Sequence, residues 1–150
     1  MRAGPVLAVA LAVLSAPAAA RNDAAAARNF LMHCAGCHHA DGHGLPQNGI
    51  PDLALSGPLA GSAEGRRFLI QVPGVAQSRL GDGELADMLN WLLDRFSRAG
   101  LPAGFQPYDA GEIVRARAEP VHDPVARRAA IVTRLPPLPS IPSSAADRPY

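Results

Sequence analysis

The segment Cys34-Ala35-Gly36-Cys37-His38 contains both cysteines of this 150-residue chain and ends in a histidine. Two thiols three residues apart, followed directly by an imidazole, form the sequence at which a c-type haem is attached. At a helix end, each thiol can add to one vinyl group of a haem, and the adjacent histidine then lies under the iron. We therefore expect one covalent haem c on Cys34 and Cys37, with His38 as the proximal iron ligand.

Other uses of the two cysteines agree less well with the sequence. A thioredoxin-type redox pair follows a strand in a βαβ unit, and no such pattern precedes Cys34. A structural zinc site needs four ligands, and the chain has no second cysteine pair. His33, His39 and His43 are nitrogen donors, but histidines clustered in a loop are more often solvated. Attachment of haem is the interpretation that the motif favours.

The first twenty residues have the pattern of an export signal. Met1-Arg2 gives a positive start, the apolar run 6–14 follows, and Ala18-Ala19-Ala20 precedes Arg21. Small residues in this arrangement are what signal peptidase accepts, so we predict cleavage after Ala20 and a periplasmic location. An uncleaved anchor is the alternative. The apolar run is too short for a transmembrane helix, and we expect no stable membrane span in the mature chain.

The charge balance excludes some classes of function. The chain has 14 basic and 13 acidic side chains, and every basic residue is an arginine. Without lysine, a Schiff-base mechanism and a phosphate loop ending in Gly-Lys-Ser/Thr are excluded. A net charge of +1 argues against a nucleic-acid binder, which normally shows a concentrated basic face.

Apolar periodicity and capping residues predict an all-α fold. The helices are expected over residues 22–34, 63–72, 82–97, 109–118 and 124–134. Ser62, Gly81 with Glu84, and Asp109 are the predicted helix starts, and Pro124 suits a first turn. Residues 39–61 are expected to be loop, and Pro73-Gly74 to end the second helix. We divide the chain into a small helical domain (21–98), a helical extension (99–134) and a proline-rich, disordered tail (135–150).

Residues 22–97 resemble a class I cytochrome c domain. The segment 34–44 is similar to the family's CxxCHxxDGxG sequence, and Phe30 lies one turn before it, where the family places an aromatic residue. Ile50-Pro51-Asp52-Leu53 resembles the family's G-x-P-x-L loop. This resemblance implies that the Pro51 carbonyl accepts a hydrogen bond from His38 and orients its imidazole. It also implies that Phe30 contacts Trp91 of the last domain helix. The resemblance ends at about Ser97.

The distal iron ligand is the point where the resemblance breaks. The loop 72–79 before the last domain helix contains no methionine or histidine, although the family usually supplies a methionine there. Met88 is the candidate that we name, with core packing in its helix as the alternative. Met32 stands within the first helix. The other candidates are His39, expected on the proximal side, His43, expected to be exposed, His122 in the extension, and an open or water-occupied position.

The resemblance implies a mono-haem electron carrier that passes single electrons between periplasmic redox partners. The alternative is a haem enzyme or gas-binding protein with an open distal site, for which Gln77, Ser78 and Arg79 offer no good proton shuttle. A third hypothesis is a haem subunit docked on a periplasmic dehydrogenase, with residues 98–134 as its docking arm. The apolar residues of that arm can equally pack on the domain itself; they are Phe105, Tyr108, Ile113, Val114 and Ile131. The near-neutral charge predicts weak long-range steering and apolar docking.

Overall fold

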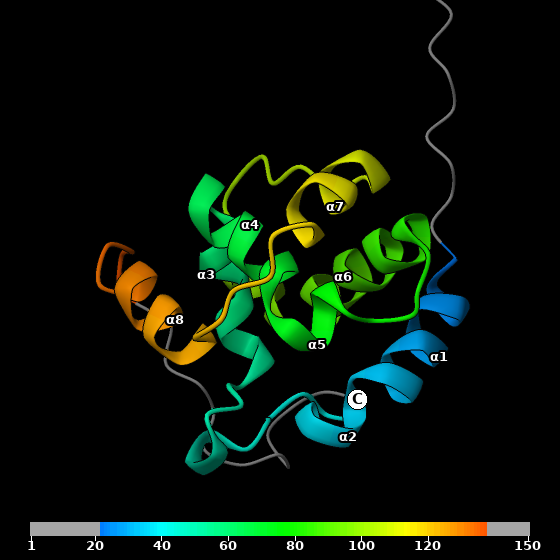
Figure 1. Ribbon diagram of the computed structural model, residues 1–150, viewed down its shortest axis with the longest axis horizontal. Coiled ribbons are helices and arrows are strands. Elements are labelled where there is room, and N and C mark those ends of the chain that lie inside the picture. Colours follow the sequence, from blue (N-terminus) through cyan, green and yellow to red (C-terminus); the bar gives the residue numbers. More distant parts are fainter. Residues whose placement is uncertain (1–21, 138–150) are drawn as a thin grey trace, which may run out of the picture.

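A computed structural model describes residues 22–137 of the chain (Figure 1). The regular structure of this range is helical, and the one β-type contact within it is an isolated bridge between Leu45 and Ile50. The all-α prediction is therefore confirmed. The predicted export signal at 1–20 and the part of the predicted tail from residue 138 onward lie outside the described residues.

The five predicted helices are present with ends that differ by no more than two residues from the predictions. The α-helices are α1 (Asp23–His33), α2 (Ala35–His38), α3 (Ser56–Ala60), α4 (Ala63–Gln71), α5 (Pro73–Ala76), α6 (Asp82–Ser97), α7 (Ala110–Arg117) and α8 (Pro124–Val132). Three 3-10 turns join them: η1 (Pro46–Asn48), η2 (Leu53–Leu55) and η3 (Arg98–Gly100). Pro73 ends α4 as expected but also begins α5. A proline fits the first helical position because the N–H that it lacks would have no partner within the helix there.

Side chains cap the helices at the positions that the sequence predicted. The Ser62 hydroxyl accepts from the N–H of Gly65 at 3.0 Å, and the Asp109 carboxylate accepts from the N–H of Glu112 at 2.8 Å. Before α6, the Gly81 N–H donates to the carboxylate of Glu84 at 3.0 Å. These bonds satisfy N–H groups that a helix start leaves without a partner.

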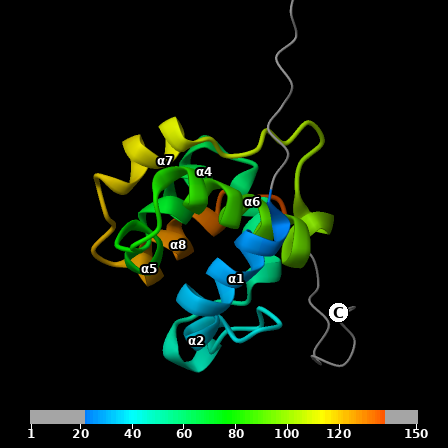
Figure 2. The same ribbon diagram turned by 90° about the vertical axis from the view of Figure 1, so that its right-hand side faces the viewer.

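Helices α1 and α6 pack against each other through an aromatic cluster, and Figure 2 shows α1 beside α6. The ring centroids of Phe30 and Trp91 lie 5.6 Å apart, which confirms the predicted contact. Phe96 adds a second contact to Phe30 at 5.1 Å and an edge-on contact to Trp91 at 5.7 Å. Tilted and edge-on pairs at these distances are the favoured aromatic geometries. The cluster fixes the helix that precedes Cys34 on the longest helix of the bundle.

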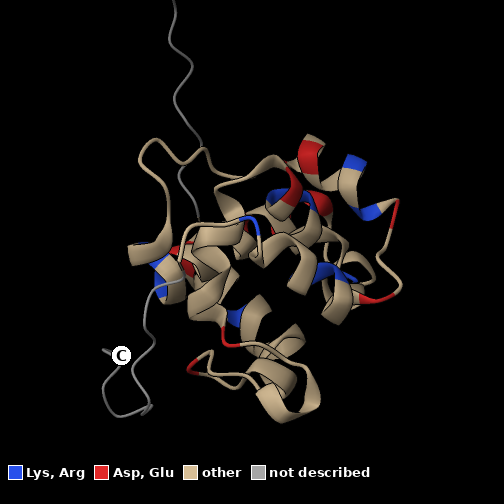
Figure 3. Cartoon of the chain, turned by 90° about the vertical axis from the view of Figure 1, so that its left-hand side faces the viewer, with Lys and Arg blue, Asp and Glu red and all other residues tan. Residues whose placement is uncertain are grey.

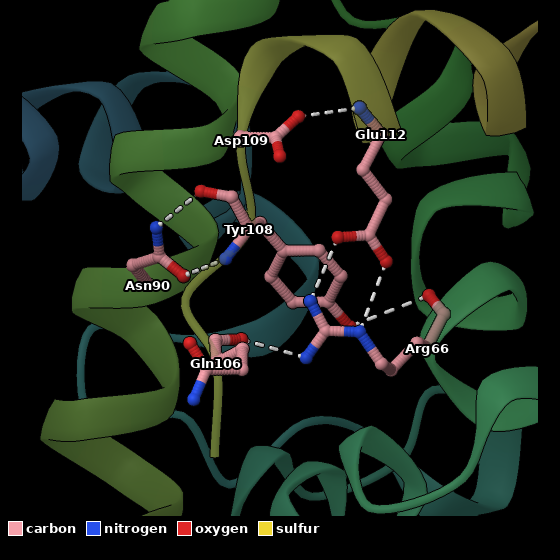
Figure 4. A network of polar contacts seen from close by, with 6 residues as sticks. All are labelled: Arg66, Asn90, Gln106, Tyr108, Asp109 and Glu112. Carbon is pink, nitrogen blue, oxygen red and sulfur yellow. Dashed lines mark hydrogen bonds and ion pairs between the residues drawn. The ribbon is translucent and has the colours of Figure 1, made fainter. Parts of the chain in front are cut away.

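The residues after α6 return to pack on the same bundle. The buried side chain of Asn90 on α6 binds the backbone of Tyr108 twice, donating to its carbonyl at 3.0 Å and accepting from its N–H at 2.8 Å (Figure 4). Tyr108 and Ile113 are both buried against the core formed with α6. The extension is thus fixed by backbone pairing as well as by apolar contact.

Arg66 of α4 binds the same segment from the side opposite Asn90 (Figure 4). The guanidinium of Arg66 donates to both carboxylate oxygens of Glu112, at 2.9 and 2.7 Å, and to the carbonyl of Gln106 at 2.8 Å. It also lies 4.3 Å from the ring centroid of Tyr108, a cation–π distance. Burial raises the pKa of the Tyr108 phenol, so its hydroxyl stays protonated and donates to the carbonyl of Arg66 at 3.3 Å.

Helix α8 packs on α4 and α3. Ile131 is 1% exposed and forms a small core with Leu59 and Phe68. Two arginines of this region, Arg127 and Arg134, pair with the carboxylate of Glu64 at 2.9 and 2.5 Å. Of the five proposed docking residues, Tyr108, Ile113 and Ile131 are buried within the bundle, Phe105 packs against it and Val114 is exposed.

Charged side chains are spread over the helices rather than gathered by sign (Figure 3). The segment 34–52, which contains the cysteine motif and the following loop, has Asp41 and Asp52 as its charged residues and no arginine. Within residues 22–137, no helix combines the length and the apolar composition that crossing a membrane requires.

Candidate cofactor site

A cavity of about 1050 Å³ lies between the cysteine motif and the extension. Its walls come from the end of α1, from α2, from residues 43–59, which include α3, from α4, α5 and α6, from Tyr108, and from the first two turns of α8. Most of the lining side chains are apolar, and many are aliphatic; they include Leu59, Leu69, Val72, Val75, Leu89 and Leu92. A space of this size and character suits a large, flat, mainly apolar ligand.

The predicted hydrogen bond of His38 is present. Its Nδ1 lies 3.2 Å from the carbonyl oxygen of Pro51, to which it donates. Burial lowers the pKa of His38, and the Pro51 carbonyl and the Asp52 carboxylate oppose this only in part. The imidazole is therefore neutral, and because its proton is held at Nδ1, the lone pair that can bind a metal lies on Nε2.

Gly44 brings the Pro51 carbonyl to His38. Its φ of +69° is in the left-handed region, and a Cβ there would lie 2.4 Å from the carbonyl oxygen of Pro51. The N–H of Gly44 also donates to the carbonyl of His38 at 3.1 Å. Only glycine combines this backbone conformation with so close an approach, so the last glycine of the CxxCHxxDGxG sequence has a structural reason.

Both cysteines are free thiols and line the cavity. Cys34 is half-buried, and burial, with a further contribution from Cys37, raises the pKa of its thiol to about 11. Cys37 lies one turn later and is exposed. The turn of α2 thus presents two thiols and the His38 imidazole on one wall.

Met88 lies on the same side of the cavity as Cys34. It is 1% exposed, and its Sδ is 3.6 Å from the Cys34 Sγ, within the cavity lining contributed by α6. Thioethers pack readily against other sulfur and apolar groups, so this position also has the character of core packing. The alternative methionine, Met32, is exposed and does not belong to the described lining.

The histidines considered as distal iron ligands differ in their position relative to the cavity. His43, expected to be exposed, is half-buried and lines the cavity, because its ring stacks on that of His39 at 4.2 Å and its Nδ1 lies 2.5 Å from Asp41. His39 and His122 do not belong to the described lining, and His122 is exposed. Gln77 and Arg79 of the distal loop are exposed as well.

Two arginines of the extension reach this region, and sequence reasoning missed both. Arg117 of α7 donates to the carbonyls of Ala76, Ser78 and Leu80 at 3.1, 2.7 and 3.1 Å and pairs with Asp82 at 2.7 Å. Arg128 of α8 lines the cavity itself. The available signal for Arg128 was its spacing, because it lies three residues after Val125 on the helical face that lines the cavity.

The residues present match what a covalent haem requires. Two thiols at the attachment spacing and an imidazole with its lone pair on Nε2 line an aliphatic cavity of adequate size. Helices joined by short loops, with this motif at the cavity wall, define a c-type cytochrome as the class of protein.

The comparisons with known proteins agree with this class. A cytochrome c-552 of Thermus thermophilus is 30% identical over 104 residues, which cover 57% of this chain and 79% of that protein. A second Thermus thermophilus cytochrome c-552 is also 30% identical over 104 residues, with 70% of its length covered. No family model matches the chain. The chain belongs to the cytochrome c family.

Proposed function

We propose that the protein is a class I, mono-haem cytochrome c that carries single electrons between redox proteins of the periplasm. The observation that supports this best is the hydrogen bond from His38 to Pro51 beside the two thiols. Membership of the cytochrome c family supports a c-type electron carrier, and the predicted export signal at 1–20 supports the location.

Each residue of the motif then has a separate task. Cys34 and Cys37 hold the haem covalently, and His38 binds the iron through Nε2. Pro51 holds the imidazole in one tautomer and orientation. The bound haem supplies a ferric–ferrous couple that changes by one electron. The aliphatic side chains of α4, α5 and α6 exclude water, and the exposed Cys37 marks the edge of the site that faces a partner.

Met88 stays the predicted distal ligand, with packing against Cys34 as the alternative. The substitution Met88→Leu separates the two, because leucine keeps the volume and removes the sulfur. Loss of the low-spin spectrum and of the methionine–ferric charge-transfer band would show ligation. An unchanged spectrum would show that Met88 is a core residue and would overturn the ligand assignment.

The attachment itself is tested by maturing the protein in a host that exports it and assembles haem c. We expect a haem-stained band that survives denaturing electrophoresis, and a protein that cycles between ferric and ferrous forms. Cys34→Ser combined with Cys37→Ser removes the band, whereas Cys37→Ser alone weakens it. Absence of covalent haem from the unmodified chain would overturn the proposed function.

A second candidate function, a haem enzyme or gas-binding protein, is favoured by the distal wall. The segment that the family uses for its distal ligand contributes Val72, Pro73, Gly74 and Val75 to the lining, and none of these binds iron. Carbon monoxide added to the reduced protein distinguishes the two functions. Rapid binding by high-spin iron would replace the carrier with this alternative, and a low-spin protein that resists carbon monoxide supports the carrier.

The proposed partners are redox proteins, of which a periplasmic dehydrogenase is one class. The segment 34–52 has two aspartates and no arginine, and this low charge density predicts docking by apolar contact, with little electrostatic steering. Burial of Tyr108, Ile113 and Ile131 within the chain argues against the extension as a free docking arm. Electron-transfer rates should change little with ionic strength. A steep fall on adding salt would contradict this mode of docking.

A further inference from the structure

Helix α8 and the cysteine motif both contribute to the lining of the cavity. In Figure 1, α2, which follows Cys34, lies at the bottom of the molecule and α8 at its left. From α8 the lining takes Pro124, Val125, Arg128 and Ala129. Positions 125, 128 and 129 fall on one helical face, so Arg128 is the charged residue on the face of α8 that lines the cavity, where Val125 is 60% exposed.

The guanidinium of Arg128 differs from those of Arg127 on the same helix and of Arg134 just after it. Its Nε and Nη2 are buried and have no hydrogen-bond partner among the described residues. Arg127 and Arg134 instead pair with Glu64 and are about half exposed. Burial alone lowers the pKa of Arg128. Arg128 is half-buried as a residue, and two buried guanidinium nitrogens without a partner are costly, so their presence on a cavity wall favours an anionic group in the ligand.

Arg128 is held firmly in this position. Ile131 fixes the following turn of α8 in the core with Leu59 and Phe68. The chain entering α8 is fixed by the N–H of Val121, which donates to the Gln71 carbonyl at 2.9 Å. At the other wall, Val125 reaches Gly49, where a Cβ would lie 3.2 Å from its Cγ2. Helix α8 therefore forms part of the cavity wall between α4 and the loop 46–50.

The chemistry of a covalently attached haem supplies such an anion at this place. The two vinyl groups that bond the cysteines lie on one half of the macrocycle, and its two propionates lie on the other half. With the thiols bonded to the vinyl groups, the carboxylates of a bound haem would lie away from the cysteine motif, among the other lining residues. Among the described lining residues, Arg128 is the one arginine, and Asp52 is the one carboxylate.

We propose that Arg128 binds a haem propionate, so that the C-terminal extension completes the cofactor site of the preceding domain. This inference rests on the proposed function, because it requires the covalent haem. A planar guanidinium with two unpaired N–H groups matches a carboxylate in geometry and charge. The extension then has a function in the site, in addition to its packing on α4 and α6.

The test compares Arg128→Met with Arg127→Met in the full-length, haem-loaded protein. Both substitutions remove one positive charge from α8, but Arg127 pairs with Glu64 on the surface. Loss of Arg128 leaves the propionate uncompensated, which favours ferric iron and lowers the midpoint potential. We expect the ferrous-to-ferric ratio at fixed poise to fall by about three- to tenfold, tenfold being 59 mV for one electron. Arg127→Met changes it much less, and Arg128→Lys retains most of the native value.

Chemical denaturation gives a second readout. The direction in which Arg128→Met changes the denaturant midpoint depends on whether Arg128 is paired with a propionate. If the propionate pairs with Arg128, Arg128→Met breaks a buried ion pair and lowers the denaturant midpoint. If Arg128 has no partner in the haem-loaded protein, replacing a buried charge by an apolar side chain leaves the midpoint unchanged or raises it. The second result would overturn the proposal.

Two other outcomes would also contradict it. Equal potentials for Arg128→Met and Arg127→Met would exclude a propionate contact. A changed spin state or changed carbon monoxide binding at constant potential would place Arg128 over the iron instead. Both results leave the proposed electron carrier intact. Absence of covalent haem from the unmodified chain overturns the proposed function first, and this inference with it.

Discussion

The substitution Asn90→Ala tests whether the extension belongs to the cooperative fold. Asn90 is 7% exposed, and its amide binds both the N–H and the carbonyl of Tyr108, 18 residues further along the chain. Alanine keeps helix α6 intact, because it is the best helix former, but removes both partners of Tyr108. The effect therefore reports on the tertiary contact and not on the helix.

The magnitude follows from two backbone groups that lose their partners. A buried polar group without a partner costs about 1–3 kcal/mol, so two give a loss of about 2–6 kcal/mol in unfolding free energy. With a guanidinium dependence of about 2–6 kcal/mol per molar, the denaturation midpoint should fall by about 0.3–3 M. This is a large share of the about 5–15 kcal/mol that stabilises a typical domain.

The matched control is Asp87→Ala, because Asp87 is exposed one turn earlier on the same helix. Its effect on the unfolding free energy should stay within about 0.5 kcal/mol. Hydrogen exchange adds a local readout, since the amide of Tyr108 loses its acceptor in Asn90→Ala and should exchange faster. Equal denaturation midpoints for the two variants would refute the reasoning and would show that the segment before α7 is held by other contacts.

Three further substitutions test separate parts of the structure. Ile131→Ala should cost about 2–5 kcal/mol of unfolding free energy, because it leaves a cavity between α8 and α4, whereas the exposed Val114→Ala should change little; equal denaturation midpoints would contradict this. Arg117→Met should cost about 1.5–3 kcal/mol of unfolding free energy and speed hydrogen exchange in residues 76–82. Unchanged exchange would show that this loop does not depend on Arg117. Gly44→Ala should cost at least about 1–2 kcal/mol for its backbone conformation and lower the yield of haem-loaded protein, and a normal yield would show that the loop tolerates a Cβ.

Local signals in the sequence predicted the helices well. Ser62 and Asp109 mark helix starts with side chains that bind the next turn, and the apolar spacing of α6 needs no tertiary information. The contact between Phe30 and Trp91 followed from the resemblance to a known family. The short helix α5 was missed because the same two residues, Pro73-Gly74, end α4 and begin α5, and the sequence indicates only the helix end.

The polar contacts of the extension were beyond sequence reasoning, for a physical reason. Asn90, Arg66 and Arg117 bind groups 18 to 46 residues away, and no periodicity encodes such partners. In the same way, the position of His43 depends on its stacking with His39 and on Asp41, so a loop histidine expected to be exposed lines the cavity.

The scarcity of aromatic residues explains why the extension matters to this small domain. With 5% aromatic residues, large side chains are few, and three of them, Phe30, Trp91 and Phe96, gather where α1 crosses α6. Around α3 and α4 the side chains are mainly aliphatic, with Phe68 as an aromatic residue, and they line the cavity. There the extension adds Ile131 to the core and lines the cavity with α8. The same segment therefore supplies packing that the domain lacks and, by our proposal, an arginine for the cofactor.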